Sequence, residues 1–100
     1  MAQLTILYWR DIPAQVIVRA GRTTAKRELS ERFTQAIDMA AMRSGASGTD
    51  AYLAEWRRAD PVACGDDLEA ETQAVVERLE AEYDKARLTA LAASGGREGA

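Results

Sequence analysis

The side chains that most often carry enzyme chemistry are scarce in this sequence. It has no histidine and a single cysteine, Cys64. The absence of histidine removes the commonest general base near neutral pH, and it makes a serine or cysteine triad with histidine impossible. One thiol cannot build a cysteine-rich zinc site or hold an iron–sulfur cluster. We therefore expect a chain that is not an enzyme on its own and that carries no cofactor.

Two remaining patterns have a chemical reading beside a structural one. Cys64 would be reactive if a helix N-terminus lowered its pKa, but the neighbouring Asp66 and Asp67 oppose a thiolate. Carboxylates spaced three and four residues apart near the C-terminus share one helix face, which suits a weakly held hard cation or a solvated surface: Glu77, Glu80 and Asp84. Neither pattern by itself defines a site.

The most unusual segment runs from Tyr8 to Gln15, at the end of an apolar run. It brings together large aromatic, guanidinium, carboxylate and amide groups, namely Tyr8, Trp9, Arg10, Asp11 and Gln15. Two interpretations are open. Either the rings belong to the core and Arg10 pairs with Asp11 or with an acidic helix, or Trp9, Arg10, Asp11 and Gln15 form a recognition surface.

Charge is distributed unevenly along the chain, although the net charge is only −3. Residues 1–32 hold six basic and three acidic side chains, whereas residues 66–84 hold eight acids and one arginine. Either the two halves attract one another or are simply solvated, or the basic half binds a polyanion. Nucleic-acid binding would use Arg19, Arg22, Lys26 and Arg27 with Tyr8 or Trp9 stacking on bases, and the acidic overall charge speaks against it.

The elements that would position these groups begin with a small antiparallel sheet. Residues 4–9 and 15–19 are apolar and β-branched, and the segment 10–13 between them contains a proline that breaks pairing. The pair Ala20-Gly21 predicts a second tight turn, and a more polar third strand over residues 22–28 suits an exposed edge. We expect two or three strands with one face covered.

Helices follow the sheet. Ser30 is a suitable N-cap for a helix over residues 31–43 that ends at Gly45, with a buried stripe of Phe33, Ala36, Ile37, Ala40 and Ala41. A second helix is expected from Thr49 to Arg57 and Arg58, then a linker over residues 59–65. Residues 67 to about 92 contain no Gly or Pro and predict one long helix capped by Asp66.

The predicted fold class is therefore α+β: a small antiparallel sheet of two or three strands packed against two short helices, followed by a long C-terminal helix. Residues 1–93 form a single domain, and residues 94–100 a disordered tail. Hydrophobic residues make up 47% of the chain and charged residues 29%, as in a globular protein. The lone cysteine and the absence of an export or membrane segment predict a cytoplasmic protein.

Several stretches together resemble the bacterial domain family labelled "virulence factor", also found at one end of conserved virulence factor C type proteins. They are residues 8–16, 31–33, 36–38, 40–43, 48–53 and 56–58, and the resemblance covers about residues 3–85. The family label records a phenotype, so it implies no catalytic residues. Stand-alone members look like companions of corrinoid- and folate-linked methyl-transfer proteins, which implies an accessory role.

These observations lead to one functional hypothesis with an alternative. We expect a non-catalytic protein-interaction or accessory module that binds a protein partner or self-associates and does not bind a membrane. Its binding residues would be Tyr8, Trp9, Arg10, Asp11, Gln15, Arg19, Arg22 and Lys26. The alternative is a nucleic-acid-binding domain that uses the basic face of the sheet.

Overall fold

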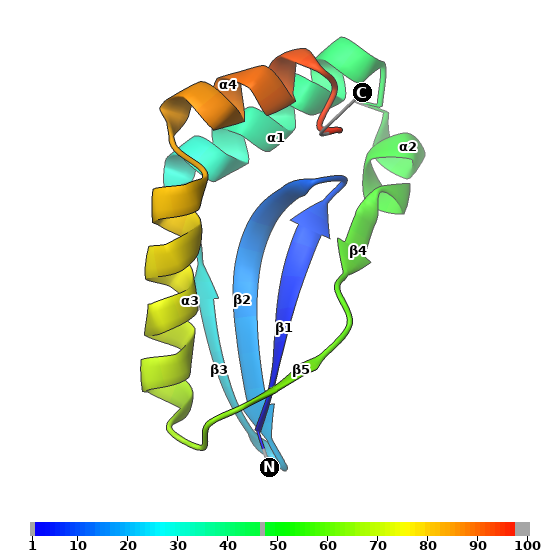
Figure 1. Ribbon diagram of the computed structural model, residues 1–100. Helices are drawn as coiled ribbons and strands as arrows, with labels where there is room; N and C mark the ends of the chain where they lie inside the picture. The colour runs from blue at the N-terminus through cyan, green and yellow to red at the C-terminus, as the bar shows by residue number, and fades with distance from the viewer. Residues whose placement is uncertain (1, 47, 98–100) are drawn as a thin grey trace.

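The computed structural model describes residues 2–46 and 48–97. In this part of the chain five strands form one antiparallel sheet and four helices pack around it. The predicted architecture is wrong, because two further strands extend the sheet and the long C-terminal helix is divided in two. The elements (Figure 1) are β1 (Ala2–Trp9), β2 (Ile12–Ala20), β3 (Thr23–Glu28), α1 (Glu31–Ser44), α2 (Thr49–Ala54), β4 (Trp56–Arg58), β5 (Val62–Cys64), α3 (Leu68–Glu82) and α4 (Lys85–Ala93).

Strands β1 and β2 form a hairpin whose turn consists of Arg10 and Asp11, and β3 pairs with the other side of β2. The pairing of the hairpin slips once near its turn, which leaves Ala14 as the extra residue of a β-bulge. The carbonyl oxygen of Ala14 accepts a hydrogen bond from the Leu29 N–H at 3.0 Å. Pro13, expected to break the pairing, lies inside β2 next to this bulge, where its missing N–H is tolerated.

Strands β4 and β5 both pair with β1 and together make one interrupted edge strand. Between them the Ala59 N–H donates to the Ile6 carbonyl oxygen at 3.0 Å. The sequence predicted Arg57 and Arg58 at the end of a helix, which is wrong, because both lie in β4. It also predicted a linker over residues 59–65, within which Val62–Cys64 form β5 instead. Helix α2 ends at Ala54, and the chain then satisfies the backbone groups along the edge of β1, which would otherwise lack partners.

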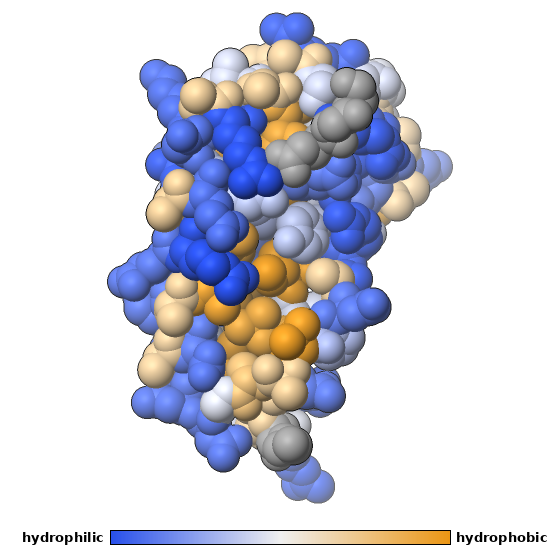
Figure 2. Space-filling model, in the orientation of Figure 1, coloured by the Kyte–Doolittle hydropathy of each residue, from blue (hydrophilic) through white to orange (hydrophobic). Residues whose placement is uncertain are grey.

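Helix α3 covers one face of the sheet, as its contacts with β2, β3 and β1 show. Its side chains Val75, Val76 and Leu79 are buried there, together with every second side chain of the strands, including Leu4, Ile6, Val16 and Val18. The helix lies nearer to β2 and β3 than to the edge strand. Figure 2 accordingly shows apolar side chains at the surface between α3 and β5, where Val62 is 61% exposed.

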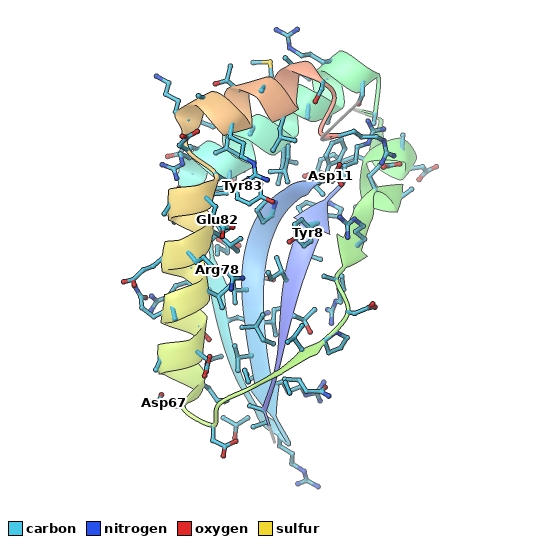
Figure 3. All side chains as sticks on the ribbon, in the orientation of Figure 1. Tyr8, Asp11, Asp67, Arg78, Glu82 and Tyr83 are labelled. Atoms are coloured by element: carbon cyan, nitrogen blue, oxygen red, sulfur yellow. The ribbon has the colours of Figure 1, made fainter. Side chains whose placement is uncertain are left out.

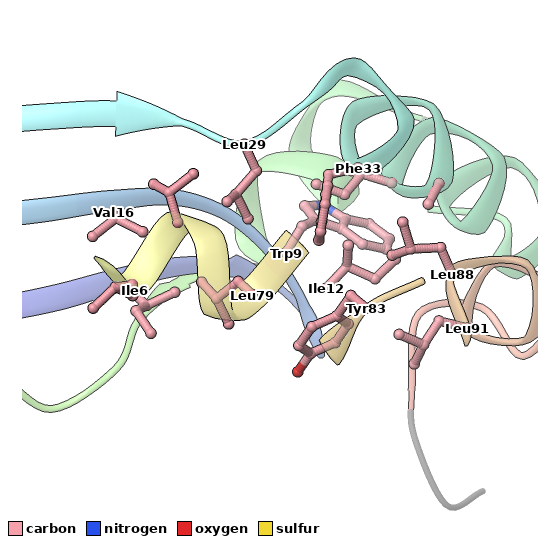
Figure 4. Close-up of a cluster of buried hydrophobic side chains, with 14 of the residues drawn as sticks. Ile6, Trp9, Ile12, Val16, Leu29, Phe33, Leu79, Tyr83, Leu88 and Leu91 are labelled. Atoms are coloured by element: carbon pink, nitrogen blue, oxygen red, sulfur yellow. The ribbon is translucent and has the colours of Figure 1, made fainter. Parts of the chain in front are cut away.

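Helices α1 and α4 run side by side in the same direction across the hairpin end of the sheet (Figure 1). Figure 4 shows Phe33 of α1 and Leu88 and Leu91 of α4 gathered around Trp9 and Ile12, which lie at the end of the hairpin. All five side chains are at most 3% exposed. The centre of the core therefore lies where the hairpin meets these two helices.

The single helix predicted over residues 67 to about 92 ends at Glu82, and a new helix begins at Lys85. Between them Asp84 is the N-cap of α4, because its carboxylate accepts a hydrogen bond from the Arg87 N–H at 2.8 Å. This break turns α4 away from α3 and onto α1. The turn buries Leu88 and Leu91, which an unbroken helix would have left off its apolar stripe.

Helix α1 agrees closely with its prediction. The five residues of the predicted stripe are buried, and Gly45 ends the helix with a left-handed φ of 76°. Ser30 is the N-cap residue, but its hydroxyl donates to the Glu80 carboxylate at 2.8 Å instead of capping the helix. At the start of α3 the cap is Asp67, which accepts from the Ala70 N–H at 3.2 Å, and not Asp66.

The chain continues past α4 into a turn that packs on the hairpin. Gly95 and Gly96 are buried, and the Gly96 carbonyl oxygen accepts a hydrogen bond from the Asp11 N–H at 2.8 Å. The sequence predicted a disordered tail from residue 94 onward. Residues 94–97 of that tail are held by these contacts, and residues 98–100 lie outside the described residues.

Candidate functional site

Within residues 2–46 and 48–97, no helix packs along most of the sheet face opposite α3. Alternate positions of the three longest strands point to it, and their side chains are exposed or half-buried: Gln3, Thr5, Leu7, Gln15, Ile17, Arg19, Thr24, Lys26 and Glu28. Arg58 joins them from β4, because it pairs with Leu7. We call these ten residues the open face. Antiparallel sheets often have one solvated face, so bareness alone indicates no function.

The open face is hollowed, with a volume of about 720 Å³. Three cations line the hollow, Arg19, Lys26 and Arg58, against one carboxylate, Asp60. Within residues 2–46 and 48–97 none of these three cations forms an ion pair. Arg19 donates a hydrogen bond to the Gly21 carbonyl oxygen at 3.3 Å. The lining of the hollow therefore has an excess of positive charge, three cations against one carboxylate, in a protein whose net charge is negative.

A smaller pocket of about 220 Å³ adjoins the hollow at Gln15, which lines both. Tyr52 and Trp56 form part of its wall, with their ring centroids 5.8 Å apart in an edge-to-face arrangement. Burial raises the pKa of the Tyr52 hydroxyl, and the Asp38 carboxylate raises it further, while a hydrogen bond with Trp56 acts in the opposite direction. Tyr52 therefore stays protonated at neutral pH. The pocket suits an apolar group that also accepts or donates a hydrogen bond.

The predicted recognition surface from Trp9 to Gln15 is not assembled as one surface. Trp9 is fully buried, its indole N–H donates to the Tyr52 carbonyl oxygen at 2.9 Å, and its ring stacks on the Tyr52 ring at 5.8 Å. Of the residues in this segment, Gln15 lies on the open face. The interpretation in which Trp9 belongs to the core fits the structure.

Arg10 is engaged in holding the hairpin turn. It has a positive φ of 54°, and its guanidinium bonds the Glu55 carboxylate at 2.9 Å and the Gly95 carbonyl oxygen at 2.8 Å. It also lies 5.0 Å from the centre of the Trp9 ring. Its predicted partner, Asp11, pairs with Arg57 instead, at 3.4 Å. Arg10 therefore joins the hairpin to α2 and to the C-terminal turn.

The other predicted residues are divided between surfaces. Tyr8 lies near the hairpin end of β1 (Figure 3), with the Arg57 guanidinium 4.6 Å from its ring centre, and it lines neither hollow. Arg22 is exposed in the turn between β2 and β3. Arg27 is exposed too, but it pairs with Val16 and so points to the other face from Lys26. Of the basic residues predicted, Arg19 and Lys26 thus lie together on the open face.

Sequence reasoning missed Arg58 and the pocket residues Tyr52 and Trp56. Residues 56–58, Trp-Arg-Arg, show no alternation that would have indicated a strand, and the two arginines fit a helix end. Cys64 lies half-buried on β5, and burial raises the pKa of its thiol, as do the carboxylates of Glu71 and Asp66. A raised pKa makes this thiol a poorer nucleophile at neutral pH.

The described residues contain neither a metal-holding cluster nor a membrane-spanning helix. No group of three or more His, Cys, Asp or Glu side chains there is arranged to hold a metal ion. No helix within residues 2–46 and 48–97 has both the length and the apolar character that a membrane crossing requires.

The fold and the site define a small α+β domain with one helix-covered and one bare, positively charged sheet face. The family model described as "Virulence factor" matches residues 7–92, most of the chain. The chain therefore belongs to the virulence factor domain family, as the sequence resemblance indicated. Searches of curated proteins and of solved structures found no match.

Proposed function

We propose that this chain is a non-catalytic interaction module that uses the open face to bind an acidic segment of a partner protein. The observation that carries this proposal is the hollow in which Arg19, Lys26 and Arg58 have no ion-pair partner among the described residues. Leaving three cations together costs electrostatic free energy that an acidic partner would recover.

The composition of the open face supports a polypeptide ligand. Gln3, Thr5, Gln15 and Thr24 offer hydrogen-bond donors and acceptors around the cations. The adjoining pocket, walled by Tyr52 and Trp56, offers a place for one apolar side chain. Protein interfaces combine such an anchoring pocket with a polar rim.

Nucleic acid is the alternative ligand for the same cations. Sheets that bind single strands stack bases on aromatic rings of their central strands. Here the central strands β1 and β2 place Gln3, Thr5, Leu7, Gln15, Ile17 and Arg19 on the open face, and none of these is aromatic. This favours an acidic polypeptide over nucleic acid.

The non-catalytic part of the proposal rests on the sequence, which has no histidine and one cysteine. Membership of the virulence factor family is compatible with an accessory role and supplies no catalytic residue. We propose that the partner belongs to a corrinoid- or folate-linked methyl-transfer system, as the family resemblance implies.

The test compares three forms of the protein as baits in lysate of the native host. One is the wild type, one is Arg19→Glu with Arg58→Glu, and the control reverses two exposed cations outside the open face, Arg22→Glu with Arg27→Glu. Far-ultraviolet circular dichroism checks that all three are folded. Because like charges across an interface cost several kcal/mol, the open-face variant should retain the partner more than tenfold less well.

The proposal requires that the partner, once identified and purified, bind the wild type and the control directly and with similar affinity. Nuclease treatment of the lysate distinguishes the alternative: if it abolishes capture, the ligand is a nucleic acid. Equal capture by all three baits, or loss with the control as well, contradicts the proposal.

A further inference from the structure

A second candidate surface lies between α1 and α4, at the end of the sheet and away from the open face. The two helices enclose a groove of about 430 Å³ between their parallel axes. Its floor is apolar and consists of Ala36 from α1 and Leu88 and Ala92 from α4, while Met39, which is 43% exposed, stands at its rim. The small alanine side chains keep the groove open.

The charged residues that line the groove are all basic: Arg32, Arg43 and Lys85. Arg32 is already engaged, because it pairs with Glu80 at 3.0 Å and donates to the Tyr83 carbonyl oxygen at 3.1 Å. Within the described residues Arg43 and Lys85 form no ion pair. Carboxylates of Glu31 and Asp84 stand near the start of the two helices, but they do not line the groove.

We infer that this groove binds an acidic amphipathic helix of a partner protein. Helix-in-groove recognition places apolar side chains at three- and four-residue spacing into such a floor and charged ones on its rim. Arg32 and Lys85 lie near the starts of α1 and α4. Arg43 lies about 16 Å from Arg32 along α1, because a helix rises about 1.5 Å per residue. Cations at both ends of an apolar floor match a helix that carries acids along its length.

The occupant is not the acidic helix α3 of a second copy. The apolar residues of α3 that such a contact needs, Val75, Val76 and Leu79, are buried against its own sheet. A small anionic amphiphile is the competing ligand class, since it also combines charge with an apolar part. A small amphiphile would place its single head group at one end of the groove. Because cations lie at both ends of the groove, a helix with several acidic side chains fits better.

The test uses a designed 14-residue peptide, acetylated and amidated, with leucine at three- and four-residue spacing and glutamate elsewhere. A matched peptide carries lysine in place of glutamate, and sodium dodecanoate represents the small amphiphile. Binding is followed by amide chemical shifts of the ¹⁵N-labelled full chain. The variant Arg43→Gln with Lys85→Gln removes the free cations, Ala93→Trp obstructs the groove, and Arg22→Gln with Arg27→Gln is the charge-matched control.

We expect the acidic peptide to shift amides of α1 and α4 and to bind more tightly than the lysine peptide. Loss of two partly exposed ion pairs should weaken its binding about 2- to 30-fold in the Arg43/Lys85 variant, with no such change in the control. Equal binding of both peptides, equal loss in the control, or groove binding by dodecanoate alone overturns the inference. Shifts confined to Thr5 and Ile17 also overturn it, while leaving the proposal for the open face intact.

Discussion

Arg10 provides a test of how the hairpin turn is stabilised, because it is held by several contacts despite an unfavourable backbone. Its φ of 54° is one that side-chain-bearing residues adopt at a cost of about 1 kcal/mol, which glycine largely avoids. In return its guanidinium pairs with Glu55 at 2.9 Å and donates to the Gly95 carbonyl oxygen at 2.8 Å. Replacing Arg10 by alanine removes the contacts and keeps the strain, whereas glycine removes both.

The two substitutions should therefore differ in a defined way. Arg10 and Glu55 are only 15% and 26% exposed, so the hydrogen bond between them should contribute about 1.5–3 kcal/mol. The bond to Gly95 adds about 1 kcal/mol. Arg97 also pairs with Glu55, at 3.1 Å, and would retain part of this stabilisation. We expect Arg10→Ala to lower the free energy of unfolding by about 3 kcal/mol and Arg10→Gly by about 2 kcal/mol.

Urea unfolding followed by tryptophan fluorescence measures both values, because Trp9 lies beneath the turn. A double-mutant cycle with Glu55→Gln isolates the coupling, expected at about 1–2 kcal/mol. If Arg10→Gly destabilises the protein as much as Arg10→Ala does, or more, the left-handed backbone at this position is refuted. If both cost less than about 0.5 kcal/mol, the contacts themselves are refuted.

Three further predictions concern single residues. Asp84→Ala removes the N-cap of α4 and should cost about 1 kcal/mol in urea unfolding, whereas Asp66→Ala, which caps nothing, should cost less than about 0.5 kcal/mol. Gly96→Ala should lower the melting temperature more than Gly21→Ala does. Both glycines have a positive φ, but a Cβ at Gly96 would lie 3.0 Å from a carbon of the Trp9 indole, whereas a Cβ at Gly21 would meet no atom within 4 Å. Burial and nearby carboxylates raise the pKa of the Cys64 thiol, so at pH 8 it should react with a disulfide reagent more slowly than the thiol of glutathione does. Its rate should also reach half of the limiting value at a higher pH than the rate of glutathione does. An equal or faster rate contradicts the assigned environment of Cys64.

The local part of the fold could be predicted where one element carries its own signals. Helix α1 has a stripe of apolar residues at helical spacing and a glycine where the chain turns left-handed, and both were readable. The hairpin was predicted for the same reason, from two apolar runs separated by a short turn. These elements are determined by residues that lie close together in the sequence, so the sequence pattern alone is enough to predict them.

The break between α3 and α4 could not be predicted in this way, because no Gly or Pro marks it. Asp84 is a suitable cap, but an aspartate within a long run of helix formers reads equally well as a surface residue. The position of the break is decided by the burial of Leu88 and Leu91 against α1, a contact between segments about 50 residues apart in the sequence. The same reasoning applies to β4, which pairs with β1 because that edge needs partners.

The candidate site was predicted only in part for a related reason. Gln15, Arg19 and Lys26 share a face by strand alternation, which the sequence shows. Arg58 reaches the same face through a strand pairing that local spacing did not reveal. Trp9 was one of the predicted binding groups because aromatic residues often anchor interfaces, but its ring is covered by contacts from segments far along the chain, including Tyr52 and Gly96.

The central claim is that the partner contacts the open face, and photocrosslinking in cells tests it most directly. A photoreactive benzoyl-phenylalanine replaces Thr24, exposed on the open face, or Glu69, exposed on α3 at the other side of the sheet. We predict a crosslinked protein adduct from position 24, lost with Arg19→Glu and Arg58→Glu, and none from position 69. An adduct from position 69 alone, or none from either position, contradicts the claim.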